Sequence, residues 1–371
     1  MAGEESGDRH GAHLLEALRR RLPDVSAFGL AGDELVAAGA TQIADSAEIS
    51  VVGLVEVLKV VRRARQIKAE LLREVDRRRP TAALLIDSPG FNLRMARSLT
   101  ERGVPVVYYV SPQIWAWWKS RVRGIAETVD KMLVLFPFEV DFYREAGLEV
   151  AHVGHPLVDD VPELPHVWDL GDQPPRRFNL TLMPGSRASE VDALLPTLLE
   201  SAKLIGDRLG ARFRLLRAGG PAGESVDRHL EASDLPVEVV RENRFQLLAD
   251  SHLALCASGT ANLELGLIGT PMIVLYKLAF WTHMASKFLL DVPHVSLVNL
   301  VLDRRVVPEL LQADARPGRI ADEAVELCRS TERVREMRGL LAELRGRLGR
   351  PGASQRAAEE LFRFLEERRP S

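Results

Sequence analysis

The chain has 371 residues, of which 46% are hydrophobic and 27% charged, and it carries a formal net charge of −3. This composition is typical of a globular protein, the length predicts two domains with a core each, and the charge argues against general nucleic-acid binding. Cys256 and Cys328 lack the spacing of a zinc site or a disulfide framework, and no apolar run approaches the roughly 20 residues of a membrane span. We therefore expect a cytoplasmic protein without a metal or another cofactor.

Two features stand near the start of the chain. A turn rich in glycine and serine, Gly3–Asp8, precedes a helix that begins near Gly11. The segment Val51–Val61 is apolar almost throughout, and four cations follow it directly between Arg62 and Lys68. An apolar surface beside cations suits the headgroup region of a membrane. Taken alone, however, the pattern favours a buried helix with a solvated polar end.

Farther along, short apolar runs alternate with helical patterns, which predicts βαβ units in a parallel sheet covered on both faces. In the first half the predicted strands are Ala82–Ile86, Val104–Val110 and Lys131–Leu135, and the predicted helices are Leu93–Arg102, Ser120–Val129 and Val140–Ala146. In the second half the predicted strands are Phe178–Met183, Arg212–Leu216, Val237–Val240, Leu253–Cys256 and Met272–Tyr276. Both halves are therefore expected to be doubly wound, Rossmann-like α/β domains.

A proline-rich stretch separates the two halves. Four prolines interrupt the periodicity between Val161 and Arg177, as is typical of an interdomain linker. We predict a first domain at 1–165, a linker at 166–177 and a second domain at 178–345, with a cleft between the domains. The remaining residues, 346–371, form a predicted helical tail that crosses back to the first domain.

The segment Tyr108–Val122 combines features of a core strand and of a binding loop. Its strand pattern ends at Ser111, and Trp115 and Trp117 follow, with basic side chains after them. Loops at the carboxyl ends of strands commonly carry function, and aromatic and basic side chains suit anionic ligands with rings or acyl chains. The individual indoles fit the protein core equally well.

Two turns of the second half match a diphosphate site. The sequence Gly185-Ser186-Arg187 follows a predicted strand and opens a helix, so its backbone N–H groups and its guanidinium can meet phosphate oxygens. The sequence Ser258-Gly259-Thr260 follows another strand, and Glu264 lies one turn into the next helix, where a carboxylate suits a ribose diol. An ordinary strand-to-helix turn with a solvated arginine is the alternative for the first motif. Together the turns predict a site for a nucleotide diphosphate.

A third candidate site lies in the first half, directly after the predicted strand Ala82–Ile86. Asp87 begins the sequence Asp-Ser-Pro-Gly-Phe-Asn, and a carboxylate at this end of a parallel strand is well placed to act as a general base. Asp87 could instead cap the following helix. His155, in the sequence Val-Gly-His-Pro, is a rival base or a phosphate contact.

Taken in order, these motifs resemble those of the lipid-A-disaccharide synthases, a family of inverting glycosyltransferases with the two-domain GT-B fold. The resemblance covers nearly the whole chain, and the aromatic segment is its most distinctive part. The matching segments are Ala2–Gly11, Asp87–Asn92, Tyr109–Val122, Phe136–Glu139, Gly154–Pro156, Pro184–Val191, Ala257–Glu264, Pro271–Lys277 and Ser296–Leu300.

The resemblance implies transfer of 2,3-diacylglucosamine from UDP-2,3-diacylglucosamine to 2,3-diacylglucosamine 1-phosphate, with inversion. It implies that Asp87 is the base, that Arg187 stabilises the departing UDP, and that Asn299 is also important for activity. The implied UDP-sugar site comprises Gly185, Ser186, Arg187, Ser258, Gly259, Thr260 and Glu264. The implied acceptor or lipid side comprises Ser6, Asn92, Ser111, Trp115, Trp117, His155, Val55 and Leu58.

The product implied by the resemblance is a β-1,6-linked tetraacyl disaccharide 1-phosphate, an intermediate of lipid A biosynthesis in Gram-negative bacteria. The segment Val51–Val61 would then dock the enzyme on the cytoplasmic face of the inner membrane, where both acylated substrates are found. The resemblance implies catalysis without a metal, and it leaves a homodimer open.

The chain departs from the family pattern in two places. Gly90 stands where many members have a second acidic residue, which leaves Asp87 as the only carboxylate of its motif. The family also has an apolar strand before the turn at Gly3, whereas here Met1 directly precedes Ala2. Because a missing central strand would leave neighbouring backbone groups unpaired, we expect the natural start to lie several residues upstream.

Two other interpretations fit the same fold. Another GT-B enzyme that acts on UDP-N-acetylglucosamine would share both domains, but it would not explain the aromatic segment beside the Asp87 motif. A catalytically silent protein that binds lipids or nucleotides would also share them, and the missing strand keeps this interpretation open.

Overall fold

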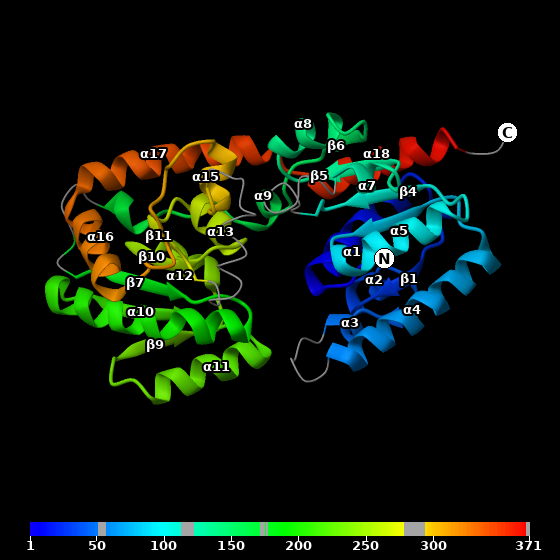
Figure 1. The fold of residues 1–371 in the computed structure, drawn as a ribbon. Helices are drawn as coiled ribbons and strands as arrows, with labels where there is room; N and C mark the ends of the chain where they lie inside the picture. Colours follow the sequence, from blue (N-terminus) through cyan, green and yellow to red (C-terminus); the bar gives the residue numbers. More distant parts are fainter. Residues whose placement is uncertain (51–56, 113–121, 171–174, 176, 278–293, 369–371) are drawn as a thin grey trace. The chain divides into compact units, whose positions relative to one another are not determined.

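The computed structural model describes residues 1–50, 57–112, 122–170, 175, 177–277 and 294–368, and the chain forms two compact units (Figure 1). Unit 1 comprises Met1–Pro156 and Leu348–Ser371, and unit 2 comprises Leu157–Arg347. The first boundary therefore lies ahead of the predicted linker at 166–177. One reason is Arg345, whose guanidinium donates to the carbonyls of Val158 and Val161, at 3.0 Å each, and so ties this stretch to unit 2.

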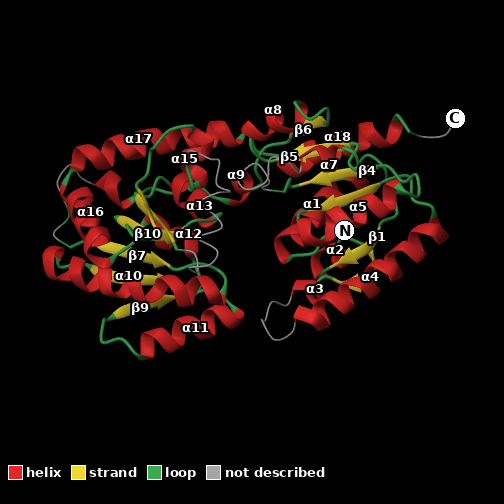
Figure 2. Cartoon of the chain, viewed as in Figure 1, coloured by secondary structure: helices red, strands yellow, loops and turns green. Residues whose placement is uncertain are grey.

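Unit 1 is built around parallel strands with helices between them, as predicted (Figure 2). Its elements are α1 (Glu5–Arg19), β1 (Phe28–Ala31), α2 (Asp33–Ala37), β2 (Thr41–Asp45), α3 (Ala47–Ser50), α4 (Val57–Arg78), β3 (Ala83–Ile86), α5 (Pro89–Thr100), β4 (Val106–Tyr109), α7 (Val122–Ala126), β5 (Lys131–Val134), α8 (Phe138–Arg144), β6 (Glu149–His152) and α18 (Ala353–Glu366). The strands form two parallel sheets in the described residues, with the orders β1-β2 and β3-β4-β5-β6.

The first two residues lie between these two sheets. The Ala2 N–H donates to the Leu30 carbonyl in β1, and the Ile86 N–H in β3 donates to the Met1 carbonyl, at 3.0 Å each. A cavity of about 790 Å³ adjoins Met1, and residues of β1, β3, α1, α4 and α18 line it. Met1 and Ala2 thus form backbone hydrogen bonds with both β1 and β3.

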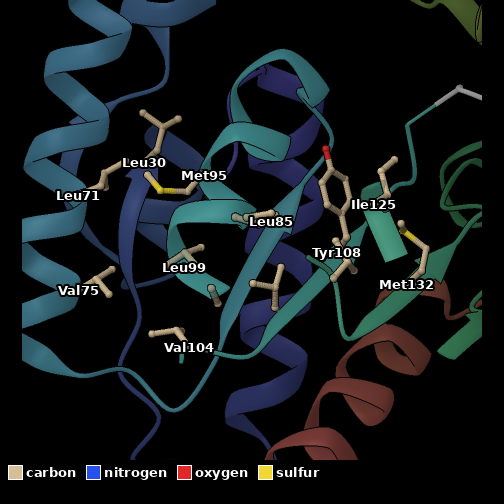
Figure 3. Packing of buried hydrophobic residues seen from close by; sticks show 14 of the residues in the cluster. Leu30, Leu71, Val75, Leu85, Met95, Leu99, Val104, Tyr108, Ile125 and Met132 are labelled. Carbon is tan, nitrogen blue, oxygen red and sulfur yellow. The ribbon is translucent and has the colours of Figure 1, made fainter. Parts of the chain in front are cut away.

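The core of unit 1 lies between the four-stranded sheet and two of its helices (Figure 3). Leu71 on α4 and Met95 and Leu99 on α5 pack with Leu85 of β3 and Tyr108 of β4. All four residues of β4 and of β5 are buried, as expected for parallel strands covered on both faces. This packing holds the carboxyl ends of β3 and β4, where the candidate residues follow, in a fixed position.

The terminal helix α18 belongs to unit 1 through both apolar and charged contacts. It packs against α1. The buried Lys131 ammonium on β5 forms ion pairs with Glu149 at 2.8 Å and with Glu360 of α18 at 2.7 Å.

Unit 2 contains one parallel sheet in the described residues, with the strand order β12-β11-β10-β7-β8-β9. Its elements are α9 (Leu157–Asp160), the 3-10 helix η2 (Val167–Leu170), β7 (Asn179–Met183), α10 (Ala188–Leu209), β8 (Arg212–Leu216), α11 (Gly220–Glu231), β9 (Val237–Val240), α12 (Arg244–Ala249), β10 (Leu253–Ala257), α13 (Ala261–Ile268), β11 (Met272–Tyr276), α15 (Leu297–Leu302), β12 (Glu309–Leu311), α16 (Pro317–Arg329) and α17 (Thr331–Leu348). Among the described residues, no helix combines the length and the apolar character that crossing a bilayer requires.

The amino group of Met1 generates a testable pH dependence. It donates to the Leu84 carbonyl at 2.7 Å, and burial lowers its pKa from 8.0 to about 5. Between these pH values the unfolded chain binds more protons than the folded chain, so stability rises with pH. From pH 6.5 to 8.0 we expect this group to raise the free energy of unfolding by about 1.5 kcal/mol, in addition to a smaller contribution from each buried histidine, because histidines are still partly protonated in the unfolded chain near pH 6.5. Urea denaturation at the two pH values measures the change.

Two extended chains serve as controls for this prediction. Five β-branched residues placed before Met1 convert the amine to a peptide N–H and can enter the cavity, whereas five Gly and Ser residues only convert the amine. Both extensions should remove the share of the pH dependence that comes from the amino group, and only the apolar one should also raise stability. Equal unfolding midpoints for both extensions would show that apolar residues gain no contacts in the cavity beside Met1.

Candidate functional site

The turn after β3 holds Asp87 in an unusual backbone conformation. Asp87 and Ser88 have φ values of 49° and 46°, in the left-handed region that non-glycine residues rarely adopt. The Asp87 N–H donates to the Tyr109 carbonyl at 3.0 Å, and its carbonyl accepts from the Tyr108 hydroxyl at 2.5 Å. Ser88, not Asp87, is the N-cap residue of α5, so the structure does not favour the capping role for Asp87. The half-buried Asp87 is thus held at the carboxyl end of a strand.

The Asn92 side chain forms hydrogen bonds to the backbone of this turn. It is fully buried, and its Nδ2 donates to the carbonyls of Ile86 at 3.0 Å and Asp87 at 2.8 Å. The sequence predicts Asn92 on the acceptor side, and these contacts add a role in fixing the backbone of Asp87.

The loop after β4 is anchored by a carboxylate that the sequence did not single out. Val110 has a φ of 62°, which is costly for a β-branched residue and marks the point where the strand ends. The Ser111 hydroxyl donates to the Glu139 carboxylate, which also accepts from the Phe136 N–H at 3.0 Å. Glu139 is 2% exposed, and the Tyr143 hydroxyl of the same helix donates to the Pro112 carbonyl at 2.8 Å. The start of the aromatic segment is therefore fixed, while Trp115 and Trp117 lie outside the described residues.

The buried His155 and the half-buried His10 lie near this edge of unit 1. The pKa of His155 is lowered from 6.5 to about 3, mainly by burial and secondarily by His10. Burial also lowers the pKa of His10 to about 4, and its ring lies 6.3 Å from that of Tyr109. With a pKa of about 3 the His155 imidazole is uncharged near neutral pH, so it can accept a hydrogen bond but holds a proton only weakly.

The turn near the start of the chain has a structural carboxylate. Helix α1 already begins at Glu5, so Ser6 lies exposed in its first turn. Asp8 is buried and accepts from the N–H groups of Gly32 at 2.6 Å and Glu34 at 2.9 Å. Asp8 therefore binds the amino end of α2, and it holds α1 against this helix.

The apolar segment Val51–Val61 is only partly described. Val55 and the side chain of Leu58 lie outside the described residues, and α4 begins at Val57. Of the cations that follow, Arg63 pairs with Glu48 at 2.6 Å and with Glu70 at 3.1 Å.

The first predicted anion turn of unit 2 contains an internal carboxylate. Glu190 accepts from the Ser186 N–H at 3.1 Å and from the Arg187 guanidinium at 2.8 Å. A Cβ at Gly185, where φ is 125°, would lie 2.6 Å from a Glu190 oxygen, so this approach requires glycine. The Arg187 side chain is 72% exposed. The turn thus binds an anionic group already, which is the chemistry that a phosphate requires.

The second predicted anion turn precedes α13. The Ser258 N–H donates to the Leu275 carbonyl at 3.1 Å, and its hydroxyl donates to the Val295 carbonyl at 2.9 Å. The N–H groups of Gly259 and Thr260 bind no acceptor among the described residues, which leaves them available to an anion. Thr260 is the N-cap of the helix.

Glu264, the predicted ribose contact, lies one turn into α13. Its carboxylate is buried and forms an ion pair with Arg244, the first residue of α12. Arg244 was not recognised from the sequence, because nothing in the spacing of α12 and α13 indicates this contact.

The two anion turns lie side by side. Strands β7 and β10 are neighbours, and Met183 pairs with Cys256 two residues before each of the respective turns. The neighbouring β11 ends at Tyr276, whose pKa is raised by burial and by the nearby Glu190 carboxylate. The structure therefore brings the residues predicted for the UDP-sugar site to one edge of the sheet. It adds Tyr276, which could have been predicted from its position at the end of a strand.

Asn299 differs from these residues because it is completely enclosed. Its Oδ1 accepts from the N–H groups of Val306 at 2.8 Å and Val307 at 2.9 Å. Its Nδ2 donates to the Val307 carbonyl at 2.9 Å and to Glu309 at 2.8 Å. Asn299 thus has no polar atom left for a ligand. Among the described residues, no group of three or more His, Cys, Asp or Glu side chains could hold a metal ion.

Comparison with known proteins gives one consistent family. The model of a family described as lipid-A-disaccharide synthetase matches residues 1–361. The lipid-A-disaccharide synthase of Myxococcus xanthus is 43% identical over 376 residues, which is 98% of this chain and 96% of that protein. The enzyme of the same name from Syntrophus aciditrophicus is 39% identical and covers 96% of this chain and 95% of its own length.

Solved structures with a similar fold have much lower identity. A UDP-N-acetylglucosamine 2-epimerase from Listeria monocytogenes superposes with a TM-score of 0.63 at 12% identity, over 97% of this chain and 95% of its own. MurG of Acinetobacter baumannii superposes with a TM-score of 0.54 at 14% identity, over 96% of this chain and 97% of its own. These likenesses confirm the predicted two-domain fold.

Replacement of Asn92 by alanine tests how the Asp87 turn is held. The carbonyls of Ile86 and Asp87 would lose a buried donor, so we expect the free energy of unfolding to fall by about 2 kcal/mol. Urea denaturation measures the loss, and the exposed Arg94→Ala on the same helix serves as a control that should change stability by less than about 0.5 kcal/mol. Equal effects of the two substitutions would contradict the supporting role of Asn92.

Proposed function

This chain belongs to the lipid-A-disaccharide synthase family, and from that premise we propose that it transfers 2,3-diacylglucosamine from UDP-2,3-diacylglucosamine to 2,3-diacylglucosamine 1-phosphate. It is therefore a hexosyltransferase of lipid A biosynthesis, and its products are the tetraacyl disaccharide 1-phosphate and UDP. The observation that carries the proposal for the donor is the pair of adjacent anion turns at the edge of the unit 2 sheet.

The donor diphosphate fits these two turns. Its oxygens would accept from the N–H groups of Gly259 and Thr260, and the exposed guanidinium of Arg187 would supply positive charge. Glu264 would accept hydrogen bonds from the ribose hydroxyls. The Glu190 carboxylate now occupies part of the first turn, so the diphosphate must either displace it or bind beside it.

The acceptor is activated by Asp87 in this proposal. Its carboxylate takes the proton from the acceptor 6-hydroxyl, and the hydroxyl oxygen attacks the anomeric carbon of the donor from the face opposite UDP. The bond from that carbon to the phosphate oxygen breaks, and the electron pair leaves with UDP. Arg187 stabilises the charge that develops on the leaving diphosphate. The strained turn and the contacts of Tyr108 and Asn92 support this role, because they fix the backbone of Asp87.

The lipid part of the proposal concerns the remaining residues of unit 1. Ser6, Ser111, His155 and the tryptophans of the aromatic segment would lie on the acceptor side. The apolar segment Val51–Val61 would bind the cytoplasmic face of the inner membrane, with cations such as Arg62 near anionic headgroups. A homodimer remains a prediction.

The direct test is product formation. The purified full chain is incubated with both acylated substrates, and mass spectrometry measures the tetraacyl disaccharide 1-phosphate. Its formation separates this function from that of a silent binding protein, and a product from UDP-N-acetylglucosamine alone would favour an epimerase. Absence of the disaccharide from a folded, UDP-binding protein would overturn the proposal.

Asp87→Asn is the sharpest substitution for the mechanism. The amide keeps the size of the side chain but cannot accept the proton, so kcat should fall roughly 10²- to 10⁴-fold while the affinity for UDP is unchanged. Steady-state kinetics and UDP titration measure the two quantities. Asp76→Asn, which alters an exposed ion pair with Arg102 in the same unit, is the matched control and should retain full activity. An Asp87→Asn enzyme with nearly normal kcat would assign the base to another residue.

A further inference from the structure

The hydrogen bonds of Asn299 do not explain how this residue could influence the reaction. The family resemblance makes it important for activity, yet the residue is fully buried and all its polar atoms are hydrogen-bonded within unit 2. Any effect on the reaction must therefore pass through a neighbour. Among its hydrogen-bond partners in the described part of the chain, the one ionisable side chain is Glu309.

Glu309 joins three separate segments of unit 2. It is the first residue of β12, where it pairs in register with Val274 of β11. Its Oε1 accepts from the Asn299 Nδ2 at 2.8 Å and from the Ser296 N–H at 2.9 Å. Its Oε2 accepts from the Val295 N–H at 3.1 Å. One carboxylate thus fixes the backbone at the start of α15, where the orientation of the helix dipole also favours a negative charge.

The same backbone leads to the second anion turn. The carbonyl of Val295, whose N–H is bound by Glu309, accepts from the Ser258 hydroxyl at 2.9 Å. Ser258 opens the turn whose Gly259 and Thr260 N–H groups have no acceptor in the described part of the chain. A hydrogen-bond path therefore runs from Asn299 through Glu309 and Val295 to Ser258.

We propose that Glu309 is a positioning residue of the nucleotide site, and that it acts through the Val295 carbonyl on the Ser258 hydroxyl. Asn299 serves the same path by orienting the Glu309 carboxylate. The hydroxyl of Ser258 is consequently an anchor of its turn, and the adjacent N–H groups are the ones that meet the diphosphate. This inference rests on the proposed function, because it takes the turn at Ser258 to bind the donor.

Charge and geometry explain why a carboxylate is needed here. Two backbone N–H groups and one amide N–H converge on Glu309, and an ionised carboxylate can accept from all three. A glutamine has one acceptor oxygen, and its NH₂ group would face N–H donors. Glu309→Gln keeps the volume of the side chain and should displace Val295, which changes the position of the Ser258 anchor.

The first measurement is UDP affinity by calorimetry. Glu309→Gln should weaken UDP binding about tenfold, since one well-placed buried hydrogen bond is lost, and kcat at saturating donor should change by less than about threefold. Ser258→Ala should weaken UDP binding by a similar factor, because it removes the same anchor. If either substitution leaves UDP affinity unchanged while the protein stays folded, the proposed path is wrong.

The double variant separates positioning from general destabilisation. If Glu309 acts through Ser258, Glu309→Gln should weaken UDP binding much less in the Ser258→Ala background than in the wild type. Additive losses would mean that Glu309 acts by another route. Ser251→Ala is the control. Ser251 lies ahead of β10, at the opposite end of this strand from the turn, and its buried hydroxyl hydrogen-bonds to Thr181 at 2.7 Å. Its replacement should therefore lower stability without changing UDP affinity.

Arg187→Ala distinguishes this inference from the proposed function. If Arg187→Ala weakens UDP binding and Glu309→Gln does not, only the role of Glu309 is refuted. If neither Arg187→Ala nor Ser258→Ala affects UDP binding, the proposed donor site itself is wrong. Should Glu309→Gln fail to fold, Glu309→Asp takes its place in both measurements, because it keeps the charge but shortens the side chain and so weakens the contacts to Val295 and Ser296.

Discussion

Parallel strand pairing is the constraint on which the candidate sites depend. Because neighbouring strands run in the same direction, their carboxyl ends reach one edge, and residues far apart in the sequence meet there. Pairing of β7 with β10 brings the turn at Gly185 beside the turn at Ser258. Pairing of β3 with β4 likewise lets Asp87 bind the Tyr109 carbonyl and the Tyr108 hydroxyl.

Buried or half-buried carboxylates are the second element that shapes these edges. Asp8, Glu139 and Glu309 each accept backbone or side-chain hydrogen bonds from segments other than their own. Each fixes a loop or a helix start with a charge-assisted bond, which is stronger than a neutral one. All three fix the backbone beside a candidate site, and none of them is proposed to contact a ligand.

Sequence periodicity predicted the well-buried strands β4, β5, β7 and β10, and it also predicted β8, β9 and β11 with the bounds that the structure shows. It missed β1, which contains Gly29, the short β12, and β2 and β6, which are largely polar or partly exposed. The site turns were predictable because they follow strong strands. The anchors Glu139, Arg244 and Glu309 were not, since their partners are brought near by tertiary packing and no local pattern indicates them.

The placement of α18 has a consequence for the order in which the chain folds during synthesis. Helix α18 packs on α1, and its Glu360 pairs with Lys131, so unit 1 uses residues from both ends of the sequence. Unit 2, by contrast, is a single continuous stretch. Unit 1 can therefore complete its contacts only after the whole of unit 2 has been synthesised, although most of its residues precede those of unit 2.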